Sequence, residues 1–485
     1  MSGRRWGVHD LLDLVLDEGS FESWDTEIDI SGHSDDYQAT LRAAAAKAGT
    51  DESVVTGRGL MHGRPVAVVA NEFRFLAGSI GRAAAERIVA AVRRATAEGL
   101  PVLATTASGG TRMQEGTPAF VRMVDISRAV MEHRAAGLPY LVYLRGPTLG
   151  GVFASWGSLA HVTVAEPGAL VGFLGPKVYE ALNGEPFPTD VQTAENLAAK
   201  GVIDAVVPAE QLPVLVERAL AVLVDPPTPP ELPVRAGGIA GDAGAWDSIR
   251  ATRARDRAGV RDLLRHGGAG TVRLRGTDEG EQDSTVVVAL TRLDGQPCVV
   301  VGQDRTRQTR ATPMGPGALR EARRAMRLAD ELGLPLVTVI DTPGAELSAR
   351  AEEGAIAGEI ARCIATLATM RVPTLSVVLG QGCGGGALAL LPAWESIATE
   401  QAWLSPLPPE GASAIVHAGD TSYAAEMAEH QQVRAVDLLA DGTVQHVVPE
   451  VEGESARSLA VAVVAEIASR LARLRETGPP GDRVS

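Results

Sequence analysis

The sequence predicts an α/β protein that contains two similar domains. Three observations predict this class: apolar runs of four to six residues are each followed by a glycine-rich turn and a helical pattern, the same order of elements occurs twice, and a segment rich in proline and glycine separates the copies. Short buried strands that alternate with helices are typical of parallel sheets with βαβ crossovers. The chain of 485 residues has room for two such domains.

The two copies share a constant spacing. A Gly-Leu-Pro tripeptide begins at Gly99 and again at Gly333, each time before an apolar run. The pair Gly150-Gly151 matches Gly384-Gly385 at the same spacing. A register kept from the tripeptide to the glycine pair, without insertion or deletion, indicates an internal duplication.

The domain boundaries follow from segment 225–245, which contains five prolines and four glycines. This composition predicts a linker that is extended at its proline-rich start and flexible at its glycine-rich end. We therefore expect one domain over residues 1–224 and a second over residues 246–485.

Helical patterns with start and stop signals lie at equivalent places in both copies. In the first copy we expect a helix capped by Ser79 and ending at Gly99, and another from Thr117-Pro118 to Gly137. The apolar positions of that second helix are Phe120, Val121, Val124 and Val130. In the second copy, residues 317–332 and roughly 353–370 occupy these places.

Composition argues against several classes of protein. The net charge of −15 and pI of about 5.2 give no support for nucleic-acid binding, which usually needs a basic surface. No apolar run approaches the length of a membrane span, and the first residues lack the apolar stretch of a signal peptide, so we expect a cytoplasmic protein. The three cysteines, Cys298, Cys363 and Cys383, form no CxxC pair, which predicts no metal site and no disulfide.

The chemistry is expected in the glycine loops, because no familiar catalytic motif occurs in the sequence. We expect the Glu115 carboxylate to be a solvated charge at the start of a helix. Loops that follow a buried strand and precede a helix expose backbone N–H groups, and neighbouring glycines let a substrate oxygen approach. The loops Ser108–Arg112 and Gly382–Ala387 are therefore candidates for oxyanion holes. The alternative is that these glycines serve only tight turns and close packing.

Long ordered motifs resemble one enzyme family. Residues 52–206 resemble the β subunit, and residues 246–415 the α subunit, of the bacterial acetyl-CoA carboxylase carboxyltransferase, fused in that order. The β-type motifs are Val54-Val-Thr-Gly-Arg-Gly59, Phe75-Leu-Ala-Gly-Ser-Ile-Gly81, Ala107-Ser-Gly-Gly-Thr-Arg-Met-Gln-Glu115 and Gly172-Phe-Leu-Gly-Pro176. The α-type motifs are Ala289-Leu-Thr-Arg-Leu-Asp-Gly295, Asp341-Thr-Pro-Gly-Ala345, Gly384-Gly-Gly-Ala-Leu-Ala389 and Glu410-Gly-Ala-Ser-Ala-Ile415.

The resemblance implies two crotonase-like domains, each a ββα superhelix, and a carboxyl transfer from carboxybiotin to an acyl-CoA. It implies that Gly109 and Gly110 donate N–H groups to the thioester oxygen, and that Gly386 and Ala387 donate to the ureido oxygen of carboxybiotin. The residues implied to line the acyl-CoA side are Ala107, Ser108, Gly150 and Gly151, and those implied to line the biotin side are Gly344 and Gly385.

Partners follow from the same resemblance and from what the sequence lacks. None of the three lysines has a neighbouring methionine, as the biotinylated lysine of a carrier would, and no ATP-binding carboxylase module is recognisable. We therefore expect a separate biotin carboxyl carrier protein and a biotin carboxylase as partners. Family active sites lie between the β-type half of one protomer and the α-type half of another, which implies a homodimer or a larger even homo-oligomer.

The sequence departs from the family pattern in three places. The four-cysteine zinc ribbon that usually begins the β subunit is not recognisable, so we expect no zinc. Asp341-Thr-Pro-Gly-Ala345 is followed by Glu346-Leu-Ser-Ala-Arg350 where Tyr-Pro-Gly is usual, and residues 416–448 diverge. Acetyl-CoA is the expected substrate, with propionyl-CoA as the alternative. Biotin-independent decarboxylation of a malonyl thioester and a non-catalytic assembly role remain open.

Overall fold

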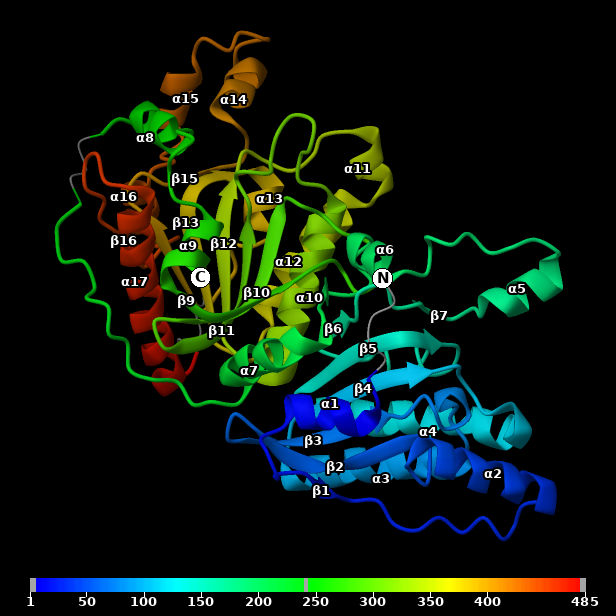
Figure 1. Cartoon of the computed structure of the whole chain (residues 1–485). Helices are drawn as coiled ribbons and strands as arrows, with labels where there is room; N and C mark the ends of the chain where they lie inside the picture. The colour runs from blue at the N-terminus through cyan, green and yellow to red at the C-terminus, as the bar shows by residue number, and fades with distance from the viewer. Residues whose placement is uncertain (1–5, 240–242, 480–485) are drawn as a thin grey trace. The chain divides into compact units, whose positions relative to one another are not determined.

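The computed structural model describes residues 6–239 and 243–479 and divides into two compact units. The first unit comprises Met1–Leu220 with Asp278–Gly280, and the second comprises Ala221–Thr277 with Glu281–Ser485. Each unit contains an eight-stranded sheet with helices packed against it (Figure 1). The predicted class, α/β with two similar sheet-containing parts, is confirmed.

From residue 6 onward, where the described part of the first unit begins, this unit contains eight strands and seven helices. The strands are β1 Glu22–Ser23, β2 Val54–Met61, β3 Arg64–Asn71, β4 Val102–Ser108, β5 Tyr140–Leu149, β6 Val162–Ala165, β7 Val171–Gly172 and β8 Ala205–Val206. The helices are α1 Val8–Val15, α2 Asp35–Ala48, α3 Arg82–Glu98, α4 Gly116–Ala135, α5 Pro176–Asn183, α6 Ala194–Ala199 and α7 Leu212–Leu223, of which α7 runs three residues past Leu220. Three short 3₁₀ turns are η1 Leu76–Gly78, η2 Met113–Glu115 and η3 Ala209–Gln211.

Within the described residues, the second unit contains eight strands and ten helices. The strands are β9 Gly268–Leu274, β10 Val286–Leu293, β11 Gln296–Gln303, β12 Leu336–Thr342, β13 Thr374–Cys383, β14 Glu395–Thr399, β15 Trp403–Ser405 and β16 His446–Val448. The helices are α8 Ala245–Thr252, α9 Val260–Gly267, α10 Pro316–Leu332, α11 Ala349–Glu353, α12 Ile356–Ala368, α13 Gly384–Leu388, α14 Pro409–Val416, α15 Ala424–His430, α16 Ala435–Ala440 and α17 Ala456–Thr477.

The two sheets have the same topology. The strand order is β1-β2-β3-β4-β5-β6-β8 with β7 on β5 in one unit, and β9-β10-β11-β12-β13-β14-β16 with β15 on β13 in the other. In both sheets the first three strands pair antiparallel and the rest pair parallel. Strand β12 begins and ends at the same spacing from β4 that separates Gly333 from Gly99, and helix α10 keeps this spacing from α3. The duplication predicted from the sequence therefore extends to whole elements.

Each sheet buries an apolar core against helices. In the first unit, α3 and α4 supply Ile88, Val92, Ile126 and Val130 to a core with Val102 and other strand residues. In the second, α9 and α17 pack Leu263 and Val463 against the strand residues Val300, Val339 and Val377. These cores fix the strand ends, and therefore the loops that follow them, in place.

Two local predictions were wrong in detail, and a third was right. Helix α3 begins at Arg82 after the N-cap Gly81, and the Ser79 hydroxyl lies 3.4 Å from Nε of Arg112. Helix α4 turns Ala119, Met123, Ile126 and Val130 to the core, whereas Phe120, Val121 and Val124 are exposed. The helix expected at roughly 353–370 is confirmed as α12, which begins at Ile356 after Ala355 takes a left-handed conformation and ends at Ala368.

The described part of the predicted linker is hydrogen-bonded to the second unit. Thr228 N–H donates to the Gly295 carbonyl at 3.1 Å, and the Asp294 carboxylate accepts the N–H groups of Glu231 and Leu232. Arg235 pairs with Glu454 at 2.8 Å. Residues 240–242 of this segment lie outside the described residues. The proline-rich start therefore has a fixed course along the second unit.

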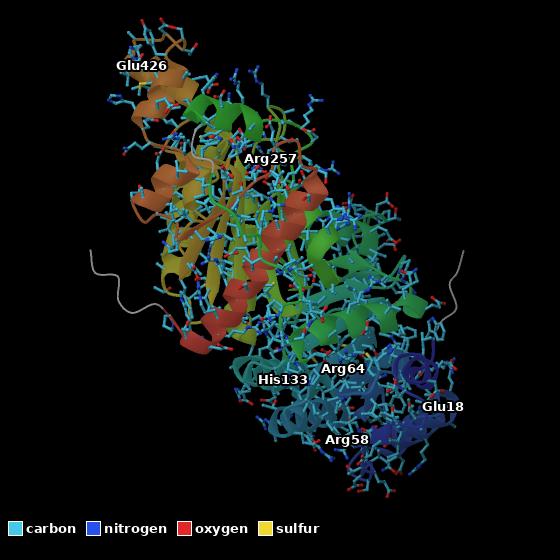
Figure 2. The ribbon with its side chains drawn as sticks, turned by 90° about the vertical axis from the view of Figure 1, so that its left-hand side faces the viewer. Glu18, Arg58, Arg64, His133, Arg257 and Glu426 are labelled. Carbon is cyan, nitrogen blue, oxygen red and sulfur yellow. The ribbon has the colours of Figure 1, made fainter. Side chains whose placement is uncertain are left out.

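Buried polar side chains inside each unit have specific partners. His133 on α4 lies inside the first unit, where burial lowers its pKa to about 4 (Figure 2). Arg257, labelled in the same view, pairs with the Glu450 carboxylate at 2.5 Å in the second unit. Such groups are stable inside a protein only when they are neutral or paired.

Candidate functional site

Two glycine loops of the first unit lie at one edge of its sheet. Strand β4 ends at Ser108 and β5 ends at Leu149, and Ser108 is in register with Thr148 on this neighbouring parallel strand. Gly110, with φ of 108°, and Gly150, with φ of 61°, turn the backbone at these strand ends. Both conformations favour glycine, so the loop sequences follow from the turns that they make.

The expected donors Gly109 and Gly110 are already engaged within the first loop. Gly109 N–H donates to the Ala77 carbonyl at 2.9 Å, and Gly110 N–H donates to the Ser108 hydroxyl at 3.1 Å. Ala107 N–H likewise donates to Oδ1 of Asn71 at 3.3 Å. In this structure the N–H groups of Gly109 and Gly110 therefore hold the loop itself, and their role toward a substrate stays a prediction.

The N–H groups of Thr111 and Gly151 are the free donors of the two loops. Among the described residues neither has an acceptor, whereas Gly150 N–H donates to the carbonyls of Gly172 and Phe173 at 3.1 Å. A Cβ placed on Gly151 would lie 3.2 Å from Oγ1 of Thr111, so the two residues are neighbours. Unpaired N–H groups that lie together are the elements of an oxyanion hole.

Peptide geometry fixes the direction of the Thr111 N–H. The Gly110 carbonyl and the Thr111 N–H belong to one trans peptide plane and point in opposite directions. Ile80 N–H donates to the Gly110 carbonyl at 2.9 Å, so the Thr111 N–H points away from Ile80.

The second unit repeats this arrangement. Gly344, with φ of 129°, donates its N–H to Oγ1 of Thr342 at 3.1 Å, as Gly110 does to Ser108. Ala345, which forms an isolated bridge with Met314, keeps a free N–H within the described part of the chain. Ala345 follows Thr111 at the spacing that separates the two copies, so the duplicated frame places the same free donor in both units.

Helix α13 supplies the other donors of the second unit. Its first three residues, Gly384, Gly385 and Gly386, have N–H groups that no intrahelical carbonyl can accept. Ala387 is the fourth residue of the helix. Within the described residues Gly385 and Gly386 keep free N–H groups, and the role of Gly386 and Ala387 as donors to a bound oxygen stays a prediction.

Because Gly386 has no side chain, it also leaves the Ala345 N–H uncovered. A Cβ on Gly386 would lie 3.2 Å from the Ala345 nitrogen and 2.6 Å from Cε of Met314. A Cβ on Gly385 would meet Cδ1 of Ile360 at 2.7 Å. The glycines therefore both shape α13 and keep the Ala345 N–H accessible.

Sequence reasoning missed two amides that hold these loops. Asn71, at the end of β3, accepts Ala107 N–H and donates to the Ser53 carbonyl at 3.1 Å. Gln303, at the end of β11, accepts Asp341 N–H at 3.0 Å and donates to the Gly386 carbonyl at 2.7 Å. The signal that could have revealed them is an amide residue ending the equivalent strand of each copy.

Burial shapes the titration of groups near the loops. It raises the pKa of the Asp341 carboxyl, which accepts from Arg305 at 3.3 Å and from Gln381 N–H at 3.1 Å. Burial also raises the pKa of the Cys383 thiol to about 12, in accord with a packing role. The residues that carry the free N–H groups, which are Thr111, Gly151, Ala345, Gly385 and Gly386, have no titratable side chain. Backbone N–H groups of this kind can stabilise negative charge on an oxygen.

The described residues include no group of three or more His, Cys, Asp or Glu that could hold a metal ion. No helix within the described ranges has the length and apolarity needed to span a membrane.

Comparisons with known proteins agree on one family. The carboxyl transferase domain family matches residues 5–468. A Mycobacterium bovis protein named "Probable biotin-dependent acyl-coenzyme A carboxylase beta3 subunit" is 55% identical, over 96% of this chain and 98% of the relative. A Saccharopolyspora erythraea protein named "Acetyl-coenzyme A carboxylase carboxyl transferase subunits beta/alpha" is 36% identical, over 96% of this chain and 84% of the relative.

A solved structure extends the agreement to the fold. The crystal structure of transcarboxylase 12S, with methylmalonyl-coenzyme A bound, superposes with a TM-score of 0.76 at 21% identity, over 99% of this chain and 92% of that chain. The fold of both units is therefore crotonase-like, as the sequence resemblance implied. With the family match over nearly the whole chain, it follows that this chain belongs to the carboxyl transferase domain family and is a carboxyltransferase of the biotin-dependent acyl-CoA carboxylases.

Proposed function

We propose that the chain is the carboxyltransferase component of a multi-subunit carboxylase, and that it moves a carboxyl group from carboxybiotin on a separate carrier protein to acetyl-CoA, giving malonyl-CoA. One observation carries this proposal: free backbone N–H donors recur at equivalent positions in the two units. Two donor sets suit a reaction in which two carbonyl-type oxygens gain negative charge, one on each substrate.

The first unit takes the acyl-CoA in this proposal. The Thr111 and Gly151 N–H groups donate to the thioester oxygen, which gains charge as the α-carbon loses its proton and an enolate forms. The direction of the Thr111 N–H is set before substrate arrives, because the Ile80 bond fixes the peptide that carries it. Donors of this kind need no reorganisation during the reaction, and one such donor contributes roughly 10²–10³ in rate.

The second unit fits the ureido oxygen of biotin. Its donors are the uncharged backbone N–H groups of Ala345, Gly385 and Gly386. The space beside the Ala345 N–H is open because Gly386 has no Cβ to fill it. Neutral donors match a neutral carbonyl oxygen whose charge grows only during the reaction. When bound, the carboxylated cofactor supplies the carboxyl group and the base. The chain's own residues bind and orient it through that oxygen.

Two alternative reactions would use N–H donors of the same site. Propionyl-CoA would use the same donors, and the transcarboxylase 12S structure binds methylmalonyl-coenzyme A, the carboxylated propionyl ester. Biotin-independent decarboxylation of a malonyl thioester would use Thr111 and Gly151 alone. The recurrence of donors in the second unit favours the carboxyltransferase, because a decarboxylase has no use for them.

The wider setting belongs to the same proposal. We infer a fusion of β-type and α-type halves, a homodimer or larger even homo-oligomer, a biotin carboxyl carrier protein and a biotin carboxylase as partners, and a cytoplasmic location. The relatives that are 36–37% identical and named as beta/alpha subunits support the order of the halves.

The reverse reaction tests the proposal. Purified protein is mixed with malonyl-CoA and free biotin, and acetyl-CoA formation is followed by chromatography, with methylmalonyl-CoA and biotin-free samples in parallel. Biotin-dependent turnover of malonyl-CoA is expected. Preference for methylmalonyl-CoA would replace acetyl-CoA by propionyl-CoA, turnover without biotin would establish the decarboxylase, and no turnover with either ester would refute the proposal.

A further inference from the structure

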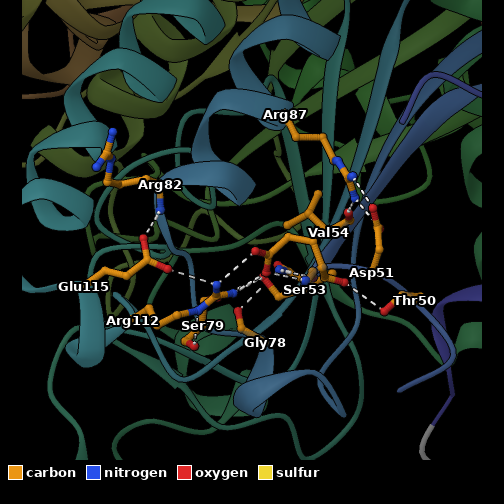
Figure 3. Close-up of polar contacts among 12 residues, drawn as sticks. Thr50, Asp51, Ser53, Val54, Gly78, Ser79, Arg82, Arg87, Arg112 and Glu115 are labelled. Atoms are coloured by element: carbon orange, nitrogen blue, oxygen red, sulfur yellow. Dashed lines mark hydrogen bonds and ion pairs between the residues drawn. The ribbon is translucent and has the colours of Figure 1, made fainter. Parts of the chain in front are cut away.

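The first unit contains a buried ionic cluster of Arg112, Glu52 and Glu115. This cluster holds in place the loop that carries the Thr111 N–H. The Arg112 side chain is 1% exposed and pairs with Glu52, which is 3% exposed. Figure 3 shows Arg112 beside Ser79 and Glu115. Nη1 of Arg112 donates to Oε2 of Glu52 at 2.9 Å, and Nη2 donates to the other carboxylate oxygen. Burial opposes the charge of Arg112, but the hydrogen bonds and charge of Glu52 outweigh it and raise the Arg112 pKa. The guanidinium is therefore permanently charged and fixed.

The Arg112 guanidinium also contacts the segment Ser79–Ile80, which orients the Thr111 N–H. Nη2 of Arg112 donates to the Ser79 carbonyl at 2.8 Å, and Nε lies 3.4 Å from the Ser79 hydroxyl. The next residue, Ile80, bonds both sides of Thr111: its N–H donates to the Gly110 carbonyl, and its carbonyl accepts Arg112 N–H, both at 2.9 Å. Movement of Ser79 would therefore move Ile80 and rotate the peptide that carries the Thr111 N–H.

Glu115 ties two helices to this cluster. Its carboxylate accepts Arg82 N–H at 2.6 Å at the start of α3, the Tyr37 hydroxyl at 2.8 Å from α2, and Nη1 of Arg112 at 3.2 Å. Burial opposes the Glu115 charge, but these bonds outweigh it and hold the Glu115 pKa below its usual range. The prediction of a solvated charge at this position was wrong.

The second unit holds its equivalent loop with different side chains: Arg305 pairs with Asp341 at the end of β12. Glu346 stands where the duplicated frame places the counterpart of Arg112, and its carboxylate accepts the Ser348 hydroxyl at 2.7 Å and pairs with Arg350, which is largely exposed. An arginine at the position of Arg112 is thus particular to the half that the proposed function assigns to acyl-CoA.

We propose that Arg112, held by Glu52 and Glu115, is a positioning residue that aims the Thr111 N–H at the thioester oxygen. This inference rests on the proposed function of the Thr111 and Gly151 donors. The cluster touches no substrate in this scheme. Its effect falls on the reaction step rather than on binding, because the donor's interaction with oxygen strengthens only as charge develops.

Arg112→Lys tests the inference because it keeps the charge and removes the fork of guanidinium donors. Arg87→Lys is the matched control: Arg87 lies in the same unit, is 7% exposed and pairs with Asp25 and Asp51, but has no bond to residues 79–81 or 109–112. Figure 3 shows Arg87 and its Asp51 partner beside the cluster. In the reverse assay we expect Arg112→Lys to lower kcat about 10- to 100-fold with KM for the CoA ester nearly unchanged. Arg87→Lys should leave kcat within about twofold while losing comparable thermal stability.

A readout independent of turnover accompanies the kinetics. Hydrogen exchange measured on peptides covering residues 109–115 should accelerate in Arg112→Lys and not in Arg87→Lys. Should Arg112→Lys fail to fold, Glu115→Gln retains an acceptor for Arg82 N–H but loses its charge beside Arg112, and an intermediate loss of kcat is expected. Equal kcat and equal exchange in Arg112→Lys and Arg87→Lys would overturn the inference, whereas absence of turnover in the unmodified protein would overturn the proposed function on which it rests.

Discussion

Replacing Gly386 with alanine should remove one donor while leaving the fold intact. The new Cβ would lie 3.2 Å from the Ala345 nitrogen, within the 2.7–3.2 Å range that an accepting oxygen itself must occupy. It would also meet Cε of Met314 at 2.6 Å, but that atom is the end of a flexible side chain and can move aside. The substitution therefore covers the Ala345 N–H without a clash between backbones.

The size of the effect follows from the donor that is lost. One oxyanion donor contributes about 10²–10³ in kcat, or roughly 3–4 kcal/mol of barrier. Alanine in a helix is more stable than glycine by about 1 kcal/mol, which offsets much of the cost of moving Met314. We therefore expect a folded variant whose kcat falls by about two orders of magnitude.

The assay is biotin-dependent conversion of malonyl-CoA to acetyl-CoA, with thermal unfolding measured on the same preparations. Gly238→Ala is the control, because a Cβ at Gly238 meets nothing within 4 Å. Gly386→Ala that folds and keeps kcat within about threefold of the unmodified protein would refute the role given to the Ala345 N–H.

Three other outcomes are expected. Burial raises the Glu321 pKa to about 7 from 4.5, so the folded state keeps a proton that the unfolded state loses, and the free energy of unfolding should fall by about 3 kcal/mol as pH rises from 5 to 8. Urea unfolding of Glu321→Gln should lack that slope, and an unchanged slope would contradict the assignment. The three buried cysteines, each with a pKa of about 12, should resist Ellman's reagent at pH 8 until the protein unfolds, and rapid native labelling would contradict their burial. Thr111→Ala keeps its N–H and should retain most activity, whereas Gly110→Ala strains a φ of 108° and should lose at least tenfold in kcat; equal activities would argue against the turn.

The sequence predicted the positions of helices and strands better than it predicted which of their faces are buried. Repeated spacing located β4, β12, α3 and α10 because each depends on local composition and on stop signals such as Gly99 and Gly333. The inward face of α4 was predicted wrongly, since Phe120 and Val124 are apolar yet lie at exposed positions. Hydrophobicity alone cannot tell a core face from an exposed apolar one.

The supporting cluster had no local signal in the sequence. Arg112 and Glu52 are 60 residues apart, and they meet only because the strand end near Glu52 and the loop after β4 reach the same edge of the sheet. Glu115 looked like an ordinary charge at the start of a helix until Tyr37 and Arg82 enclosed it. Contacts of this range follow from topology, which local patterns do not encode.

The free N–H groups of the loops follow one pattern in both units. In each unit a glycine with positive φ precedes a free donor: Gly110 precedes Thr111, Gly150 precedes Gly151, Gly344 precedes Ala345 and Gly384 precedes Gly385. The left-handed glycine turns the chain, and the peptide that follows it carries its N–H outward. The residue after the turn is a threonine, an alanine or a glycine, and in the proposed function only its backbone N–H is used. The glycine motif therefore marks the turn, and the N–H that we propose to bind oxygen belongs to the residue after it.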